Sequence, residues 1–514
     1  MLFRSALTVP LMTHIIGFDI GTTSTIGILI GLPDRILHIA TRPVTLTAPH
    51  PGWAEEDPQQ WWSNVGEIAR ELISVGGITA SDVKAVGVTG MLPAVVLLDA
   101  EGELLRPSIQ QSDARCAEEV VELRQLVDEH AFTQKTGNGV NQQLVIAKLL
   151  WIKKHEPQIF ARIATVFGSY DYINWRLTGE RAVEQNWALE GGFVNLANHQ
   201  IDDELVKLAG IARNALPRKT VSHEVLGHIT EHAAKETGLP AGVPVIAGAA
   251  DHIASALAAG IARPGDVLLK FGGSVDVLIA TDRVAPDPRM YLDYHLVPGL
   301  YVPNGCMATG GSGLNWFVAN FAEGERPKAE AQGMSLHQWL DRQAQAVPAG
   351  AQGVRILPYF LGEKTPVHDA DVRGAILGLS LAHGPAHLWR ALLEAYAYGI
   401  AHHVEVLNDM GHRTEVYFAS DGGSKSTVWM QIVADVLQKP VQRLAGHPGS
   451  CLGAAWTAAM GIGLANDWSA IGRFVSPADR LEPDPANAGT YAKGYADFRR
   501  LYPAIAELEL KETP

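Results

Sequence analysis

A carboxylate followed by glycine and hydroxyl residues stands at positions 19–24, in the order Asp19-Ile20-Gly21-Thr22-Thr23-Ser24. Phosphate oxygens need backbone N–H and hydroxyl donors, and glycine lets the backbone approach a ligand closely. Asp19 suits Mg²⁺ held through water, because Mg²⁺ favours carboxylates together with phosphates. The segment therefore predicts a phosphate site. A tight hairpin turn is the alternative, since these residue types are also common turn formers.

Three further glycine-rich turns occur in the second half of the chain. They are Gly272-Gly273-Ser274, Gly310-Gly311-Ser312-Gly313 and Asp421-Gly422-Gly423-Ser424. A glycine-rich turn at a helix N-terminus can bind phosphate or a nucleoside through its amide dipoles. Each turn alone is more often structural, but together with Asp19 and Asp251 they favour a nucleotide site. The chain has no P-loop motif and no strong Rossmann fingerprint.

The elements around these turns alternate between strands and helices. Apolar runs at 15–20 and 26–30 predict a hairpin around the first turn, and 242–248 predicts a strand that leads to Asp251. Residues 267–271 predict another strand that ends at Gly272. Amphipathic spacing predicts long helices at 385–411 and 426–437. This alternation predicts an α/β fold, with a domain boundary near residue 260.

Composition limits the classes of function. The chain has 514 residues, 47% of them hydrophobic and 19% charged, which is typical of a globular enzyme of two or three domains. A net charge of −14 argues against a nucleic-acid partner. No apolar run is long enough for a membrane helix, and the first eleven residues make a poor signal peptide. The three cysteines are far apart and predict free thiols in the cytoplasm.

From about residue 15 to about residue 463 the chain resembles the FGGY family of carbohydrate kinases, most closely its xylulokinase-like branch. The matching segments include FDIGTTST at 18–25, GWAEEDPQQWW at 52–62, AGAADH at 247–252, LLKFGGSVD at 268–276, GGSGLNWF at 310–317, LPYFLGEKTP at 357–366, RGAILGLS at 373–380, SDGGSKSTVWMQIVADVLQKP at 420–440 and LGAAW at 452–456. So many segments in order, at plausible spacing, are not expected by chance.

The resemblance implies an α/β fold with two actin-like (ribonuclease H-like) domains and an ATP cleft between them. We expect an N-terminal domain at 12–260, a C-terminal nucleotide-binding domain at 261–480 and a helical extension at 481–514. It also implies phosphoryl transfer from ATP, with Mg²⁺, to a hydroxyl of a small sugar or polyol. We expect no membrane partner, and the resemblance suggests a homodimer.

The resemblance also assigns roles residue by residue. Asp251 is the implied general base, and an N-cap for the following helix is the alternative. His252 either touches substrate or packs beside Asp251. The implied ATP and phosphate ligands are Asp19, Gly21, Thr22, Thr23, Gly272, Gly273, Ser274, Gly310, Gly311, Asn315, Gly422 and Gly423. The implied sugar-pocket residues are Trp53, Met91, Leu92, Asp113 and Asp251, and the implied Mg²⁺ carboxylates, acting through water, are Asp19 and Asp251.

The sugar side departs from the family pattern. Met91-Leu92-Pro93-Ala94 stands where xylulokinases usually carry Gln-Met-His-Gly, and Gln111 stands where Trp is frequent. Gly273 stands where the second phosphate loop usually has Thr. A lost donor to a sugar hydroxyl can shift specificity strongly. A pentulose such as xylulose is the expected substrate. The alternatives are a ribulose-, erythritol- or glycerol-type kinase, a catalytically weak sugar sensor, or another phosphotransferase on this scaffold. Lys148 and Trp151 are interpreted as structural.

Overall fold

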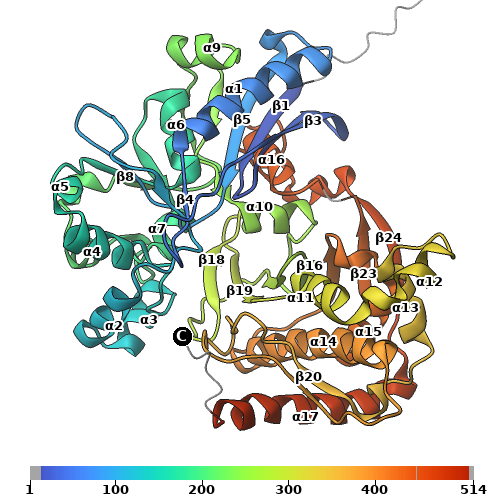
Figure 1. Ribbon diagram of the computed structural model, residues 1–514. Coiled ribbons are helices and arrows are strands. Elements are labelled where there is room, and N and C mark those ends of the chain that lie inside the picture. The colour runs from blue at the N-terminus through green and yellow to red at the C-terminus, as the bar shows by residue number, and fades with distance from the viewer. Residues whose placement is uncertain (1–12, 447, 509–514) are drawn as a thin grey trace, which may run out of the picture. The chain divides into compact units, whose positions relative to one another are not determined.

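The computed structural model describes residues 13–446 and 448–508 (Figure 1), and this part of the chain forms two compact units. Unit 1 contains 13–136, 140–258 and 448–474, and unit 2 contains 137–139, 259–446 and 475–508. The expected domain limits stay predictions. Residues 448–474, which we expected in the C-terminal domain, pack in unit 1. The expectation about residues 1–11 lies outside the described residues.

The core of unit 1 is a mixed seven-stranded sheet in the order β13-β14-β5-β1-β2-β3, with β15 also paired to β5. The predicted hairpin is confirmed, since β1 and β2 are antiparallel. β1, β5 and β15 run parallel. The strands are β1 (His14–Ile20), β2 (Ser24–Gly31), β3 (Arg35–Pro43), β5 (Val83–Gly90), β13 (Val225–His228), β14 (Pro244–Ile246) and β15 (Ala249–Ala250).

Helices and small two-stranded sheets surround this core. The small sheets pair β4 (Glu55–Glu56) with β7 (Ser108–Ile109), β6 (Val96–Leu98) with β8 (Thr165–Phe167), β9 (Ala182–Glu184) with β12 (Arg218–Thr220), and β10 (Val194–Asn195) with β11 (Gln200–Ile201). The helices are α1 (Pro58–Val75), α2 (Ala117–Leu126), α3 (Glu129–Thr136), α4 (Val145–His155), α5 (Pro157–Phe160), α6 (Ser169–Thr178), α7 (Gln185–Glu190), α8 (Asp203–Leu208), α9 (Glu231–Thr237), α10 (Asp251–Ala258) and α16 (Ser450–Gly461).

Unit 2 is built on a second mixed sheet, in the order β18-β19-β17-β16-β22-β23-β24, and a separate pair, β20 with β21. The strands are β16 (Asp266–Phe271), β17 (Val275–Ile279), β18 (Tyr291–Tyr294), β19 (Tyr301–Met307), β20 (Arg355–Leu357), β21 (Ala375–Leu377), β22 (Val416–Ser420), β23 (Val441–Ala445) and β24 (Ser476–Leu481). The helices are α11 (Gly311–Phe317), α12 (Arg326–Glu330), α13 (Leu336–Gln345), α14 (Pro385–Asp409), α15 (Thr427–Leu437) and α17 (Ala488–Ala506). The predicted helices at 385–411 and 426–437 are therefore confirmed.

The two sheets share one topology. In unit 1 the antiparallel strands β3, β2 and β1 are followed by the parallel strands β5 and β14 and then by antiparallel β13. In unit 2 the same pattern runs through β19, β17 and β16, then β22 and β23, and then β24. This repeat agrees with the expected pair of actin-like domains. The expected ATP cleft stays a prediction.

Helices cover both faces of the unit 1 sheet. Gly27 of β2 lies under Ile68 and Leu72 of α1, on the same face as Phe18. Consecutive strand residues point to opposite faces, so Gly17 faces away from α1 and toward α16. A Cβ on Gly17 would lie 2.1 Å from the Cys451 carbonyl oxygen. The backbone of α16 therefore rests directly on β1.

Two other glycines allow the same close approach. A Cβ on Gly87 of β5 would lie 2.2 Å from the Ala454 carbonyl oxygen. A Cβ on Gly453 would lie 2.1 Å from the carbonyl oxygen of Ala254 in α10. The LGAAW segment thus packs against both β5 and α10, and α10 begins with Asp251.

Two other observations concern the described residues as a whole. Cys116, Cys306 and Cys451 are free thiols, as predicted. None of the helices found in 13–446 and 448–508 combines the length and the apolar character that crossing a membrane requires.

We expect Gly17→Ala to destabilise unit 1 by about 2 kcal/mol or more, because an added methyl group must push two backbones apart. Urea unfolding followed by tryptophan fluorescence measures the change. Gly489→Ala in α17 is the matched control, since its Cβ would meet nothing within 4 Å and alanine favours a helix. Equal unfolding midpoints for Gly17→Ala and the wild type would contradict the packing described for α16.

Candidate active site

The carboxyl ends of three parallel strands bring the predicted residues of unit 1 to one edge of the sheet. In the strand register Ile20 pairs with Gly90, and Gly90 pairs with Ala250. Neighbouring strands lie roughly 4.8 Å apart, so the loops that follow them are close neighbours. Asp19 and Asp251 therefore stand at the same edge, one on each side of β5.

The first predicted phosphate loop is a closed turn. The Gly21 N–H donates to the Ser24 carbonyl at 3.0 Å. The Thr22 hydroxyl donates to the Met91 sulfur at 3.6 Å, while Thr23 is exposed. The first predicted phosphate loop therefore contacts the predicted sugar loop through the Thr22 and Met91 side chains, which follow the neighbouring strands β1 and β5.

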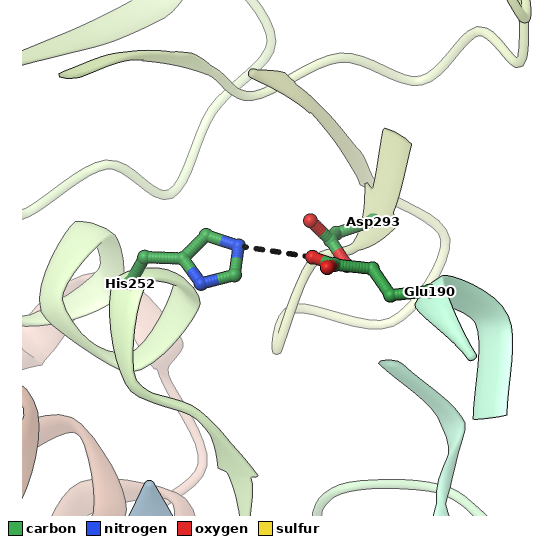
Figure 2. Close-up of side chains that lie close together, drawn as sticks. All are labelled: Glu190, His252 and Asp293. Atoms are coloured by element: carbon green, nitrogen blue, oxygen red, sulfur yellow. Dashed lines mark ion pairs between the residues drawn. The ribbon is translucent and has the colours of Figure 1, made fainter. Parts of the chain in front are cut away.

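Asp251 is the first residue of α10, and its side chain is 37% exposed. Its Oδ1 accepts from the His252 backbone N–H at 2.6 Å and lies 3.3 Å from His252 Nδ1. Figure 2 shows the His252 ring pointing toward Glu190, whose Oε1 lies 3.9 Å from Nε2. His252 therefore packs between two carboxylates, and it leaves Asp251 accessible to a substrate.

The predicted sugar-pocket residues Trp53 and Asp113 meet at Arg115. The guanidinium stacks on the Trp53 ring, 3.7 Å from its centroid, and forms an ion pair with Glu55 at 2.8 Å. Asp113 is fully buried, and its oxygens accept from Arg115 Nε at 2.8 Å, Arg115 Nη2 at 2.7 Å and the Ala54 N–H at 2.5 Å. Asp113 therefore holds Arg115 and the Trp53 segment in place. Its direct contact with a sugar stays a prediction.

Electrostatics agree with this arrangement. Burial alone would raise the pKa of Asp113, but the hydrogen bonds from Arg115 and Ala54 outweigh burial and lower it. Burial likewise opposes the charge of Arg115, yet its bonds to Asp113 and Glu55 raise its pKa. Both groups therefore stay charged at neutral pH, so Trp53 rests on a permanent cation.

Met91 and Leu92, the other predicted sugar-pocket residues, are largely buried, with 3% and 7% of their surface exposed. The Met91 N–H donates to the Ile20 carbonyl at 3.0 Å, so the loop after β5 begins against the end of β1. A pocket wall made by this loop is apolar, and its polar contacts come from backbone groups.

In unit 2 the second predicted phosphate loop, Gly272 to Ser274, carries the start of α11. The Gly311 and Ser312 N–H groups donate to the carbonyls of Gly272 and Gly273, at 2.9 and 3.0 Å. A Cβ on Gly310 would lie 2.7 Å from the Ser274 carbonyl oxygen. Glycine at 310 is thus needed for the Gly272 to Ser274 loop to contact the Gly310-Gly311 turn. The two predicted loops pack directly against each other.

The third glycine-rich turn lies beside this pair. β22 runs parallel to β16, and Lys270 pairs with Ser420, so Asp421 follows at the same edge as Gly272. A cavity of about 550 Å³ opens there, with Gly422 on its wall. Its lining residues are Asp421, Gly422, Ser424, Lys425, Arg443, Leu444, Ala445, Gly446 and Ala478.

Two of the predicted ATP ligands, Gly423 and Asn315, have other partners in unit 2. A Cβ on Gly423 would lie 2.6 Å from the Trp429 ring and 2.8 Å from Phe271 Cβ, so packing alone requires glycine there. Asn315 Oδ1 lies 2.9 Å from His337 Nε2. Contact of either residue with ATP stays a prediction.

The segment LPYFLGEKTP at 357–366 supports the strand that leads to Gly310, a role that the sequence did not reveal. Glu363 accepts from the Ala308 N–H at 2.7 Å, and burial raises the pKa of Glu363 to about 8. Thr365 Oγ1 accepts from the Cys306 N–H at 2.6 Å. The two side chains therefore hold the end of β19, directly before Thr309-Gly310-Gly311.

A histidine completes this brace. His403 Nδ1 lies 2.8 Å from the Gly399 carbonyl, which can only accept, so Nδ1 carries the proton. Burial lowers the pKa of His403 to about 4, so the ring is neutral and Nε2 accepts from the Thr365 hydroxyl at 2.9 Å. Thr365 and His403 were missed because their role depends on a contact between distant positions, and no local sequence pattern indicates such a contact.

Comparisons with known proteins cover nearly the whole chain. The model of the FGGY family of carbohydrate kinases, N-terminal domain, matches residues 14–258, and that of the C-terminal domain matches residues 273–462. Xylulose kinase of Escherichia coli is 30% identical over 500 residues, which are 96% of this chain and 99% of that protein. Xylulose kinase of Bacillus subtilis is 27% identical over 97% of this chain and 98% of that protein.

A solved structure is more similar still. The crystal structure of xylulose kinase from Rhodospirillum rubrum has 56% sequence identity to this chain and a TM-score of 0.91. The match covers 96% of this chain and 99% of that one. The two-domain α/β fold predicted from the sequence is thereby confirmed.

We expect Thr365→Val to raise the KM for ATP about fivefold, which corresponds to about 1 kcal/mol. The variant leaves the Cys306 N–H without its acceptor, so the Gly310-Gly311 turn is held less firmly. Initial rates at varied ATP and saturating sugar measure the effect, and we expect the sugar KM to stay within about twofold.

Thr237→Val is the matched control. Thr237 is also fully buried, and its hydroxyl donates to the Ala233 carbonyl at 2.7 Å and accepts from the Leu239 N–H at 3.2 Å, but it lies on α9 of unit 1. It should lose stability and keep the ATP KM. The brace has no role in nucleotide binding if both variants show the wild-type KM for ATP.

Proposed function

The chain belongs to the FGGY family of carbohydrate kinases and is an ATP-dependent sugar kinase, and we propose that the sugar it phosphorylates is the ketopentose xylulose. The observation that carries the choice of sugar is the 56% identity, over 96% of this chain, to a solved xylulose kinase. Ribulose-, erythritol- and glycerol-type acceptors are the alternatives. These alternatives stay open because the Met91 to Ala94 loop differs from the usual xylulokinase pattern. None of its side chains can donate a hydrogen bond to a sugar hydroxyl.

We propose that Asp251 is the general base that takes the proton from the attacking hydroxyl. Its position at the carboxyl edge of the unit 1 sheet, its exposed side chain and the neighbouring His252 ring support this role. Phosphoryl transfer depends on positioning and charge stabilisation more than on covalent catalysis. A base that is held in place by the helix start adds about 10²- to 10⁴-fold.

The nucleotide would bind through the glycine-rich loops. Gly21 to Thr23 of unit 1, and Gly272 to Ser274 with Gly310-Gly311 of unit 2, offer backbone and hydroxyl donors for phosphate oxygens. The cavity of about 550 Å³ beside Gly422 is of the size that a nucleoside needs. Lys425 and Arg443 on its wall can donate to phosphate oxygens, while Asp421 on the same wall and Asp479, which pairs with Arg443, are acidic.

Mg²⁺ fits the donors at the unit 1 edge, because Asp19 and Asp251 supply the hard oxygen atoms that this ion prefers. These two carboxylates would hold the ion through water. When bound, Mg²⁺ neutralises charge on the phosphates. Location in the cytoplasm and a homodimeric state also stay predictions.

We expect Asp251→Asn to lower kcat for xylulose by about 10²- to 10⁴-fold while ADP still binds. Asparagine caps a helix as well as aspartate does, so a residue that only caps α10 would tolerate the change. The measurement is a coupled ADP-release assay with Mg-ATP over a panel of ketopentoses, tetritols, hexitols and glycerol.

Asp57→Asn provides the matched control. Asp57 caps α1 by accepting from the Gln59 N–H at 2.9 Å, and it takes no part in the proposed site. Near-normal turnover of Asp251→Asn would remove Asp251 from the role of base. A wild-type enzyme that prefers another member of the panel would overturn xylulose as substrate, and ADP release at full rate without any sugar would favour an ATPase.

A further inference from the structure

A lysine ammonium is completely buried inside unit 1. Lys148 lies on α4 and has no exposed surface. Removing an ammonium from water costs several kcal/mol unless the protein replaces its hydration. A methionine or leucine would fill the same space without that cost, so a charged residue at this position calls for a reason beyond packing.

The ammonium bridges two backbone segments. Lys148 Nζ donates to the Pro93 carbonyl at 3.2 Å and to the Gln110 carbonyl at 2.8 Å. Pro93 belongs to the loop that follows β5 and contains Met91 and Leu92. Gln110 follows β7 and stands three residues before Asp113. Lys148 therefore joins the two segments that supply the proposed sugar-pocket residues.

No ion pair of Lys148 occurs among the residues that the structure describes. Burial lowers the pKa of Lys148 to about 8, and the charged or titratable groups that act on it are Asp113, Arg115, Cys116 and Glu190. Asp113 is already occupied by Arg115. The two carbonyls are thus the direct partners of the cation, and they hold it at a fixed distance from both segments.

Other side chains anchor the Met91 to Ala94 loop but do not connect it to the second segment. Ser169 of α6 donates to the Met91 carbonyl at 2.7 Å, and Trp187 of α7 donates to the Ala94 carbonyl at 2.8 Å. Lys148 differs from both because its second hydrogen bond reaches Gln110. It alone among these three donors sets the distance between the loop and the segment that leads to Asp113.

We propose that Lys148 is a positioning residue for the sugar, which acts by fixing the separation of the Pro93 and Gln110 segments. This inference rests on the proposed function, in which these segments line the acceptor pocket. In the usual family pattern a histidine side chain at residue 93 would contribute to sugar selectivity. Here we assign part of that selectivity to the hydrogen bond from Lys148 to the Pro93 carbonyl. Proline at 93 has no N–H to offer, so its carbonyl is the polar group that can be held.

Lys148→Met tests the proposal, because methionine has a similar length but no charge and no donor. We expect the KM for the best sugar of the panel to rise about tenfold or more, while the KM for ATP stays within about twofold. We also expect the ratio of kcat/KM between xylulose and ribulose to approach one, since a looser pocket discriminates less well. Calorimetric titration with ADP shows whether the variant is folded.

Lys153→Met is the matched control, because Lys153 lies on the same helix and is exposed. It should leave both KM values and the sugar ratio unchanged. If Lys148→Met does not fold, Lys148→Gln carries the test, since its amide still donates to carbonyls and should raise the sugar KM by a smaller factor.

The outcomes separate this inference from the proposed function. A wild-type enzyme that prefers a sugar other than xylulose overturns the proposed substrate, and the test of Lys148 then uses the preferred sugar. Folded Lys148 variants with the wild-type sugar KM and sugar ratio overturn the inference, whatever the substrate is. An equal rise in the KM values for sugar and ATP also overturns it, because it shows a general structural role.

Discussion

Pairing between parallel strands at the centre of each sheet is the constraint on which the rest of the structure depends. β1, β5 and β15 in unit 1, and β16 and β22 in unit 2, end at a common edge within their own sheet. Parallel strands place their following loops side by side, so residues far apart in sequence come together without further design. Asp19 and Asp251 are far apart in the chain and reach the same edge of the sheet in this way, one on each side of β5.

Close packing holds these edges in register. Glycines at 17, 87 and 453 let the backbone of α16 touch β1, β5 and α10, and no larger residue could replace them without moving one of these elements. Polar braces then hold the loops: Thr365 and Glu363 support the strand before Gly310, and Arg115 supports Trp53. Because buried polar groups cost free energy when a partner is lost, each brace fixes one geometry.

Local patterns were enough to predict the elements that carry the site. The hairpin around Gly21, the strand before Gly272 and the helices after Pro385 and Ser426 follow from apolar spacing and turn chemistry. The phosphate and base roles came from the family resemblance, since glycine-rich turns alone are ambiguous. The fold and the kinase class were therefore within reach of the sequence.

The contacts that position the site residues could not be predicted from the sequence. Lys148 was interpreted as structural because it lies on a predicted helix, and only the folded chain reveals its two carbonyl partners. The resemblance implied that Asp113 contacts the sugar, which stays a prediction, and nothing in the sequence indicated its ion pair with Arg115. The return of residues 448–474 to unit 1 also depends on tertiary packing, which overrides order along the chain. Such long-range pairings leave no periodic signal.

Amide hydrogen exchange with and without Mg-ADP tests most directly whether the strand-edge loops hold the nucleotide. The account predicts slower exchange in peptides that cover 20–24, 271–275, 308–313 and 421–424, and unchanged exchange in α9. Slower exchange confined to other parts of the chain, or none at these four loops while ADP is bound, would contradict it.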